Sequence, residues 1–444
     1  MSNWTYLAYL AVFGFWFYCV YRDGRTGIGI RLMFGINLSL YFLVGPALGE
    51  VFGTEDLRFF LHPVEPAAQL ALGALASYVF AAYLLMPVLV RRRTLVPDKL
   101  VRLGQHPGWV ATQVRLGWAL VGLGTFGLLT TGMASRIPTL GAVLGQMGQL
   151  ADAGFLILVV AYVTARRFRP LGWVLAVMFG RGLILAAISG HAAVIVIGGC
   201  VAMFIAVTTD RLRLGRVTAG LLLALVLTVP TSYWLAGRSD LRQAIREGAS
   251  LTDTVSLTLD IFFSPRPMAA SGFADRYRQR GDYSDLMAAA MTHTPAIQPY
   301  AGGDTYVESL SALLPRFIWT DKQVIAGGNE FVSQYTGVTF AHETSVAMHY
   351  MFEMYVNFGT PGVVIGMMLL GLLMAGLEHL YYISLPERFF WQYASVYAAA
   401  AISLSSDRAS DVLMTVPPGL VMCALVWYLA SAAVIAPRLG EAAQ

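Results

Sequence analysis

The stretch EMYVNFGTPGVVIGMMLLGLLMAGLEHL (353–380) decides the fold that this sequence predicts. It is longer than the roughly 20 mainly apolar residues that a helix needs to cross the hydrocarbon of a bilayer. Within it, GMMLLGLLMAG (366–376) repeats small residues at a spacing typical of close contact between membrane helices. We therefore expect a transmembrane helix that begins near Glu353 and packs closely against its neighbours.

Composition extends this expectation to the whole chain. Of the 444 residues, 57% are hydrophobic and 13% are charged, which is more apolar than ordinary soluble domains. The bilayer offers no water to backbone groups and the sequence lacks the alternation of a membrane β-barrel, so the spans should be helices. We predict an all-α polytopic membrane protein with about 11 transmembrane helices. The predicted spans are 4–20, 28–49, 67–90, 109–131, 150–165, 171–189, 191–208, 217–236, 353–380, 390–404 and 413–435.

The charges of the short connections predict the orientation of the bundle. The connections 21–27, 91–108, 166–170 and 210–216 are basic, whereas the alternate connections 50–66 and 132–149 are acidic or carry a single arginine. Since basic loops stay cytoplasmic, the N-terminus is predicted outside and the C-terminus inside.

The predicted spans and their orientation divide the chain into three regions. An N-terminal bundle of about eight helices (1–236) precedes a large periplasmic connection (237–347), and about three further helices follow (348–444). Within the connection, residues 239–263 place apolar side chains at helical spacing, which predicts amphipathic helices that lie on the bilayer.

Polar residues gather just before the span that starts near Glu353. His342, Ser345, His349, Glu353 and Asn357 follow one another at intervals of three or four residues, which would place them on one face of a helix. Two interpretations remain open. The stripe either satisfies polar groups of neighbouring helices, or it supplies a general base, Glu353 or His349, whose pKa burial moves toward neutrality.

Cationic residues in the same region suggest an anion site. Arg316 and Lys322 bracket the aromatic pair Phe317 and Trp319. An arginine fork matches phosphate oxygens, although an arginine near lipid also pairs with headgroups. Further candidates near the outer face are Arg238, Arg266 and Arg408. Arg181 lies mid-span, where a charge requires a protein partner or a ligand anion.

Several classes of function are not indicated. His342-Glu343 is not followed by the second histidine of H-E-x-x-H, and the three cysteines form no CxxC pair, so we expect no metal. The chain contains no P-loop or dinucleotide fingerprint, so no cofactor is expected. Its arginine clusters flank apolar spans, which indicates anchoring of the topology and not binding of nucleic acid.

Residues 303–359 contain several short motifs in a fixed order: Gly303-Asp304-Thr305-Tyr306, then Pro315-Arg316, Trp319 and Lys322, and then Glu353-Met354-Tyr355-Val356-Asn357-Phe358-Gly359. In these motifs the chain resembles the bacterial O-antigen and exopolysaccharide repeat-unit polymerases of the Wzy type, which are related to the O-antigen ligases. The resemblance implies an architecture similar to the lipid-dependent, GT-C-like glycosyltransferases in the bacterial inner membrane. It also implies polymerisation of undecaprenyl-pyrophosphate-linked repeat units at the periplasmic face without a metal.

The resemblance suggests roles for individual residues. Glu353 or His349 is the expected base, and the phosphates and sugars are expected to contact Arg316, Lys322, Arg238, Arg266, Arg181, Arg408, Tyr306, Trp319, His342, Tyr355 and Asn357. The implied partners are the lipid-linked donor and acceptor, membrane lipids and a chain-length regulator protein. Two other functions stay open: a ligase that transfers glycan to another acceptor, and a transporter or flippase for lipid-linked sugar, which the lack of repeated broken helices disfavours.

Overall fold

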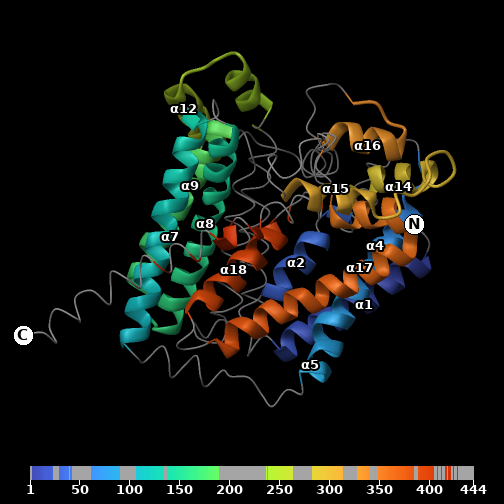
Figure 1. Cartoon of the computed structure of the whole chain (residues 1–444), viewed down its shortest axis with the longest axis horizontal. Helices are drawn as coiled ribbons and strands as arrows, with labels where there is room; N and C mark the ends of the chain where they lie inside the picture. Colours follow the sequence, from blue (N-terminus) through green and yellow to red (C-terminus); the bar gives the residue numbers. More distant parts are fainter. Residues whose placement is uncertain are drawn as a thin grey trace, which may run out of the picture.

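A computed structural model describes the chain over 3–23, 30–39, 41–42, 62–90, 107–134, 138–189, 237, 239–263, 283–313, 328–340, 346, 349–384, 389–404, 408 and scattered positions between 412 and 428. Within these residues all regular structure is helical, with no strand (Figure 1). The predicted all-α class is therefore confirmed.

Among the residues that the structure describes, three helices are long and apolar enough to cross a membrane: Glu65–Leu89, Arg169–Ala187 and Tyr350–Ile383. The first consists of α4 (Glu65–Val79), the π-helix η3 (Phe80–Leu85) and α5 (Met86–Leu89). The second lies within α9 (Phe168–Ser189), and the third is α17 (Tyr350–Ile383). These helices fall on the predicted spans 67–90, 171–189 and 353–380 and support the membrane class.

Five more of the described helices occupy positions of predicted spans. They are α1 (Asn3–Asp23), α2 (Ile30–Ser39), α7 (Pro107–Ala134), α8 (Pro138–Thr164) and α18 (Phe389–Leu404). Their crossing of the membrane remains a prediction. The predicted spans 191–208 and 217–236, and most of 413–435, lie outside the described residues, so the total of about 11 also remains a prediction.

The predicted connection 132–149 is mostly helix, because α7 continues to Ala134 and α8 already begins at Pro138. Proline suits the first turn of a helix, where its missing N–H leaves no bond unmade. The two helices approach closely through glycines, since a Cβ at Gly154 would lie 2.7 Å from the carbonyl oxygen of Gly117. The helical pair is thus longer than hydropathy alone suggested.

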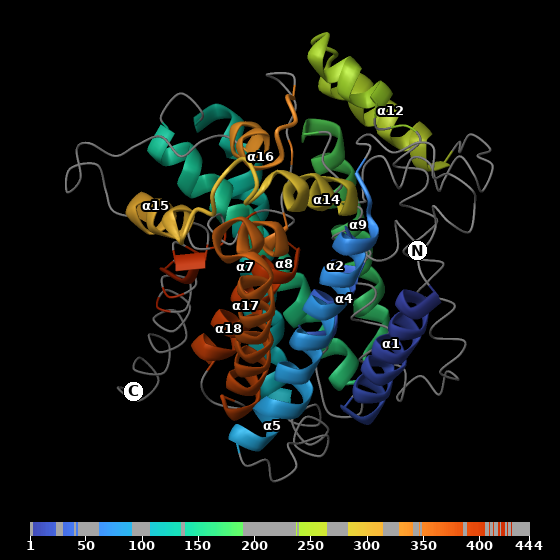
Figure 2. The ribbon, with the colours of Figure 1, turned by 90° about the vertical axis from the view of Figure 1, so that its right-hand side faces the viewer.

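Helix α17 contacts α2, α4, η3 and α18. Figure 2 shows it between α18 and α4. A Cβ at Gly371 would lie 2.6 Å from the carbonyl oxygen of Tyr78 on α4, so a small residue is needed there. The close helix contact predicted for 366–376 is confirmed at this glycine.

The long connection before α17 also contains helices. They are 239–246, α12 (Leu251–Phe263), α14 (Ser284–His293), α15 (Asp304–Leu313) and α16 (Gly328–Thr336). The helices predicted within 239–263 are confirmed, whereas their contact with a bilayer stays a prediction. In Figure 1, α12, α14, α15 and α16 lie at one end of the molecule and α5 at the other. We call the end that contains α12, α14, α15 and α16 the α14–α16 end.

Candidate functional site

The site is built around the start of α17. His349 precedes the helix in an extended conformation (φ −80°, ψ 154°), and its Nδ1 accepts the N–H of Met351 at 3.3 Å. The side chain is therefore an N-cap, and Val346 before it is also non-helical. The prediction of one helix face from His342 to Asn357 is wrong, because the helix begins only at Tyr350. Glu353 and Asn357 do share a face.

Gly359 interrupts α17. Its φ of 67° and ψ of −158° fall in a region that is essentially restricted to glycine. A Cβ there would also lie 2.8 Å from Oη of Tyr300. Pro361, two residues later, suits the first turn of a new helical segment. We call residues 350–358 the short segment of α17.

The loop before α15 covers the end of the short segment. The break leaves the carbonyls of Val356 and Asn357 without partners in their own helix. The N–H of Ala301 donates to the Val356 carbonyl at 2.9 Å, and that of Gly302 to the Asn357 carbonyl at 3.1 Å. Gly303 donates its N–H to Oδ1 of Asn357 at 2.9 Å. Three successive backbone donors thus fix α15 relative to α17.

Thr305, Glu353 and Asn357 form a buried group that we call the carboxylate network. Oγ1 of Thr305 donates to Oε1 of Glu353 at 3.1 Å. Nδ2 of Asn357 donates to Oγ1 of Thr305 and to the Glu353 carbonyl, both at 2.8 Å. The Glu353 side chain is 0% exposed. A buried carboxylate is costly, so it is normally held by hydrogen bonds, and it can accept a proton from a bound hydroxyl.

His349 lies beside this network but serves a different role. Because Nδ1 accepts the Met351 N–H, Nε2 carries the proton, and it donates to Oδ1 of Asn37 at 3.1 Å. The ring is fully buried against Phe34 and Phe42, and burial lowers the pKa of His349 to about 3. A proton added at Nδ1 would break the cap. The arrangement therefore favours Glu353 over His349 as a base.

Two predicted aromatic residues lie on the short segment or against it. The ring of Tyr306 stacks on that of Phe358 at 6.3 Å, and burial together with the charge of Glu353 raises the pKa of the Tyr306 hydroxyl. Tyr355 donates its hydroxyl to the carbonyl of Thr294 at 3.1 Å, which ties α17 to the turn after α14. Tyr306 thus borders the carboxylate network, whereas Tyr355 is a tether.

Of the five arginines predicted to contact the substrate, Arg181 and Arg408 are among the residues that the structure describes. Arg408 is buried with its guanidinium 5.2 Å from the ring of Phe331 on α16, which brings it to the α14–α16 end. Nη1 of Arg181 donates to Asp152 at 2.8 Å and its Nη2 to the carbonyl of Gly148 at 2.7 Å. The partner that a mid-span arginine requires is therefore present within the protein.

The remaining predicted substrate contacts lie outside the described residues. They are Arg238, Arg266, Arg316, Trp319, Lys322 and His342. Their convergence on Glu353 stays a prediction. Among the described residues no group of His, Cys, Asp and Glu is arranged to hold a metal ion.

Residues 108–393, more than half of the chain, match the family described as Domain of unknown function (DUF8712). The chain belongs to this family. The carboxylate network lies inside the matched range, whereas Asn37 and Arg408 lie outside it. No curated protein and no solved structure is significantly similar to the chain.

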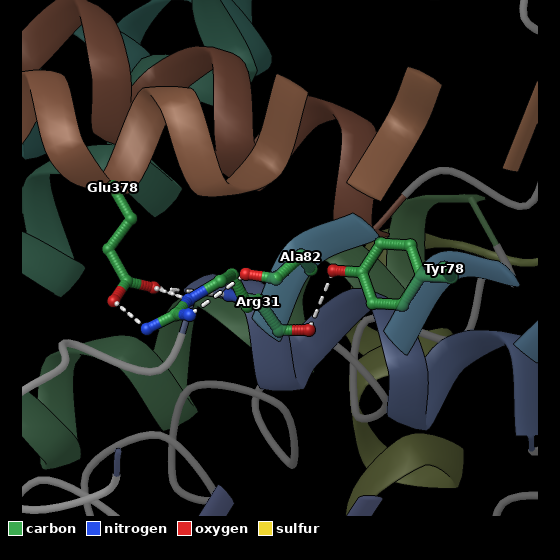
Figure 3. Close-up of polar contacts among 4 residues, drawn as sticks. All are labelled: Arg31, Tyr78, Ala82 and Glu378. Atoms are coloured by element: carbon green, nitrogen blue, oxygen red, sulfur yellow. Dashed lines mark hydrogen bonds and ion pairs between the residues drawn. The ribbon is translucent and has the colours of Figure 1, made fainter. Parts of the chain in front are cut away.

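This DUF8712 protein also contains a buried ion pair that the sequence analysis missed (Figure 3). Nη2 of Arg31 lies 2.9 Å from Oε1 of Glu378, and its Nε donates to Oε2 at 3.2 Å. Nη1 donates to the carbonyl of Ala82 at 3.1 Å, and Tyr78 donates its hydroxyl to the Arg31 carbonyl at 2.8 Å. Both charged residues fall within predicted membrane spans, where a charge needs a partner, and this could have indicated the pair from the sequence.

The π-helix explains why the Ala82 carbonyl accepts this bond. The N–H of Met86 bonds to Ala81, the pattern of a π-turn, and not to Ala82. The next residue is Pro87, which has no N–H. Arg31 therefore donates to a carbonyl that its own helix leaves open, and the pair joins α2, η3 and α17.

Proposed function

We propose that this protein is a glycan polymerase of the bacterial inner membrane that joins lipid-linked repeat units at the periplasmic face. The acceptor hydroxyl attacks the anomeric carbon of a glycan carried on undecaprenyl pyrophosphate. A new carbon–oxygen bond forms while the bond to the pyrophosphate breaks, and the lipid pyrophosphate leaves. The hydroxyl proton passes to Glu353.

The observation that carries this proposal is the buried carboxylate of Glu353 at the start of a candidate membrane span. Burial and a neighbouring histidine that is held neutral fit a general base, and the hydrogen bond from Thr305 orients the carboxylate. A base at the beginning of a span would lie near the depth of a lipid headgroup, where a lipid-linked sugar is presented. This geometry agrees with the resemblance of Glu353–Gly359 to the polymerase motif.

Pyrophosphate is already a good leaving group, so the reaction needs charge stabilisation more than acid catalysis. We assign this role to Arg316 and Lys322, with Arg238, Arg266 and Arg408 as further candidates. Bidentate arginine contacts would substitute for a metal ion at the phosphates.

A lipid-linked-sugar transporter is the second candidate, because α17 is interrupted at Gly359. Discontinuous helices are frequent in transporters, where their free ends face the substrate. Here the last carbonyls of the short segment, those of Val356 and Asn357, accept the N–H groups of Ala301 and Gly302, which makes this break a fixed structural element. We therefore rank the polymerase first.

The test uses purified protein in detergent with lipid-linked single repeats as the substrate. A polymerase produces chains of several repeats, whereas a transporter leaves the length unchanged because detergent offers no compartments. A ligase would transfer glycan only after a different acceptor is added. If wild-type protein elongates nothing under any of these conditions, the proposed function is wrong.

The base assignment has its own test in the same assay. The Glu353→Gln variant should lose roughly 10²–10⁴-fold in elongation rate, the usual contribution of a general base. Glu330→Gln is the matched control, because Glu330 is an exposed carboxylate on the nearby α16. Equal rates for Glu353→Gln and wild type would remove Glu353 from the mechanism and leave the polymerase activity itself standing.

A further inference from the structure

Helix α15 has an unusual distribution of side chains. Thr305 and Ser309 point inward and are 6% and 1% exposed, whereas Val307 and Leu310 point outward and are 65% and 51% exposed. A helix on the surface of a soluble protein normally buries its apolar side and exposes its polar side. The arrangement in α15 is the reverse.

The inward polar face is explained by its hydrogen bonds. Thr305 donates to Glu353, and Ser309 donates its hydroxyl to the Thr305 carbonyl at 2.7 Å. The apolar face is not explained in this way. Val307 and Leu310 are three residues apart and lie on one side, while the exposed Asp304 and Glu308 are four apart and lie on another. The outer surface of α15 is thus itself amphipathic.

The apolar side of α15 continues onto α17. Tyr306 stacks on Phe358, which is half-exposed, and a Cβ at Gly362 would meet Cδ2 of the Phe358 ring at 3.4 Å. One turn farther along α17, the exposed stripe Ile365, Leu369 and Leu373 begins. Figure 2 shows α15 lying across the end of α17.

That stripe belongs to a candidate membrane span, so lipid is the expected neighbour of its exposed apolar residues. The apolar face of α15 meets the end of this surface, and its acidic side chains give it a second, water-seeking side. An apolar face, a charged face and an orientation across the span are the properties of a helix in the membrane interface.

We propose that α15 is an interfacial helix, with Val307 and Leu310 in the acyl-chain region of the leaflet at the α14–α16 end and Asp304 and Glu308 toward water. The occupant of this face is bilayer lipid. The inference rests on exposure and on continuity with α17, and it does not depend on the reaction proposed for Glu353. It sets the depth of the carboxylate network, because Thr305 lies on the same helix.

The test compares single-cysteine variants, Leu310→Cys and Glu308→Cys, in a chain whose Cys19, Cys200 and Cys423 are replaced by alanine. Each carries an environment-sensitive fluorophore and is reconstituted into phosphatidylcholine and phosphatidylglycerol vesicles. We expect a blue-shifted emission from position 310. Lipids that carry a nitroxide near the headgroup end of the acyl chain should quench the fluorophore at position 310 several-fold more strongly than the fluorophore at position 308. Iodide in the buffer should quench position 308 more strongly.

Two results would overturn the proposal. Equal quenching of both positions by iodide would place the apolar face in water. Protection of position 310 from both quenchers would show that protein, such as a second copy of the chain, covers it. Val307→Cys repeats the measurement on the same face and must agree with Leu310→Cys. Unchanged thermal melting of the labelled proteins excludes unfolding as the cause, and neither result bears on the elongation assay.

Discussion

His349 makes the stability of the protein depend on pH. Burial lowers the pKa of this histidine from 6.5 to about 3, so between these values the unfolded chain binds a proton that the folded chain does not. The stability present above pH 6.5 is therefore lost as the pH falls, by at most about 1.4 kcal/mol per pH unit from this residue. His349→Asn keeps an N-cap and removes the titration. The melting temperature in detergent should fall more steeply from about pH 7 to pH 5 for wild type than for this variant. Parallel curves would mean that His349 is not buried in its neutral form.

The break in α17 predicts a second effect of a single residue. Gly359→Ala forces a Cβ into a conformation that only glycine adopts readily, and against the hydroxyl of Tyr300. We expect a loss of about 1–3 kcal/mol in stability. Gly376→Ala is the control on the same helix, because its Cβ would meet only Met86 at 3.9 Å. It should be neutral or stabilising. Similar melting temperatures for both variants would indicate that α17 runs straight through position 359.

The carboxylate network shows how far single residues can be predicted. The spacing of four between Glu353 and Asn357 places them on one helix face, and this local rule held. Thr305 is 48 residues from Glu353, and Asn37 is 312 residues from His349. No periodicity relates such distant positions, so neither hydrogen-bond partner was assigned. The role of His349 as a cap was missed because it depends on a helix start that the regular spacing obscured.

At the scale of elements, the Arg31–Glu378 pair should hold α2, η3 and α17 together. Removing one partner leaves a buried charge without its counterpart, so Arg31→Met and Glu378→Leu should each cost about 3–5 kcal/mol in stability. The double variant removes both charges and should be less destabilised than the sum of the two. A double-mutant cycle of melting temperatures in detergent measures this coupling. Additive losses would show that the two residues act independently.

Helix positions were easier to predict than helix ends and breaks. Apolar runs located α4, α9 and α17 because hydrocarbon requires long apolar segments. The start of α8 at Pro138 was missed, since hydropathy marks the part of a helix within lipid and not its extension beyond it. The break at Gly359 did have a signal in Gly359-Thr360-Pro361-Gly362, where glycine and proline interrupt a helical pattern. The long apolar run around it outweighed that signal.

For the whole molecule, the two ends should lie on opposite sides of the membrane. The α14–α16 end carries α16, and the other end carries α5, which leads into the basic connection 91–108 (Figure 1). Because basic connections stay cytoplasmic, α16 is predicted to face the periplasm. In a chain without its native cysteines, Glu330→Cys should react with a membrane-impermeant maleimide in intact cells whose outer membrane has been permeabilised. Arg92→Cys should react only after lysis.

Comparing the two cysteine variants distinguishes the orientation of the protein in the membrane from the accessibility of each thiol. Both positions must react after lysis, which shows that each thiol is accessible in the folded protein. Labelling of Arg92→Cys alone in intact cells would invert the predicted orientation and place Glu353 near the cytoplasmic leaflet. A donor carried on lipid pyrophosphate at the periplasmic face would then be out of reach, and the polymerase proposal would fail together with the orientation. Labelling of Glu330→Cys alone places the carboxylate network on the side where that donor is presented.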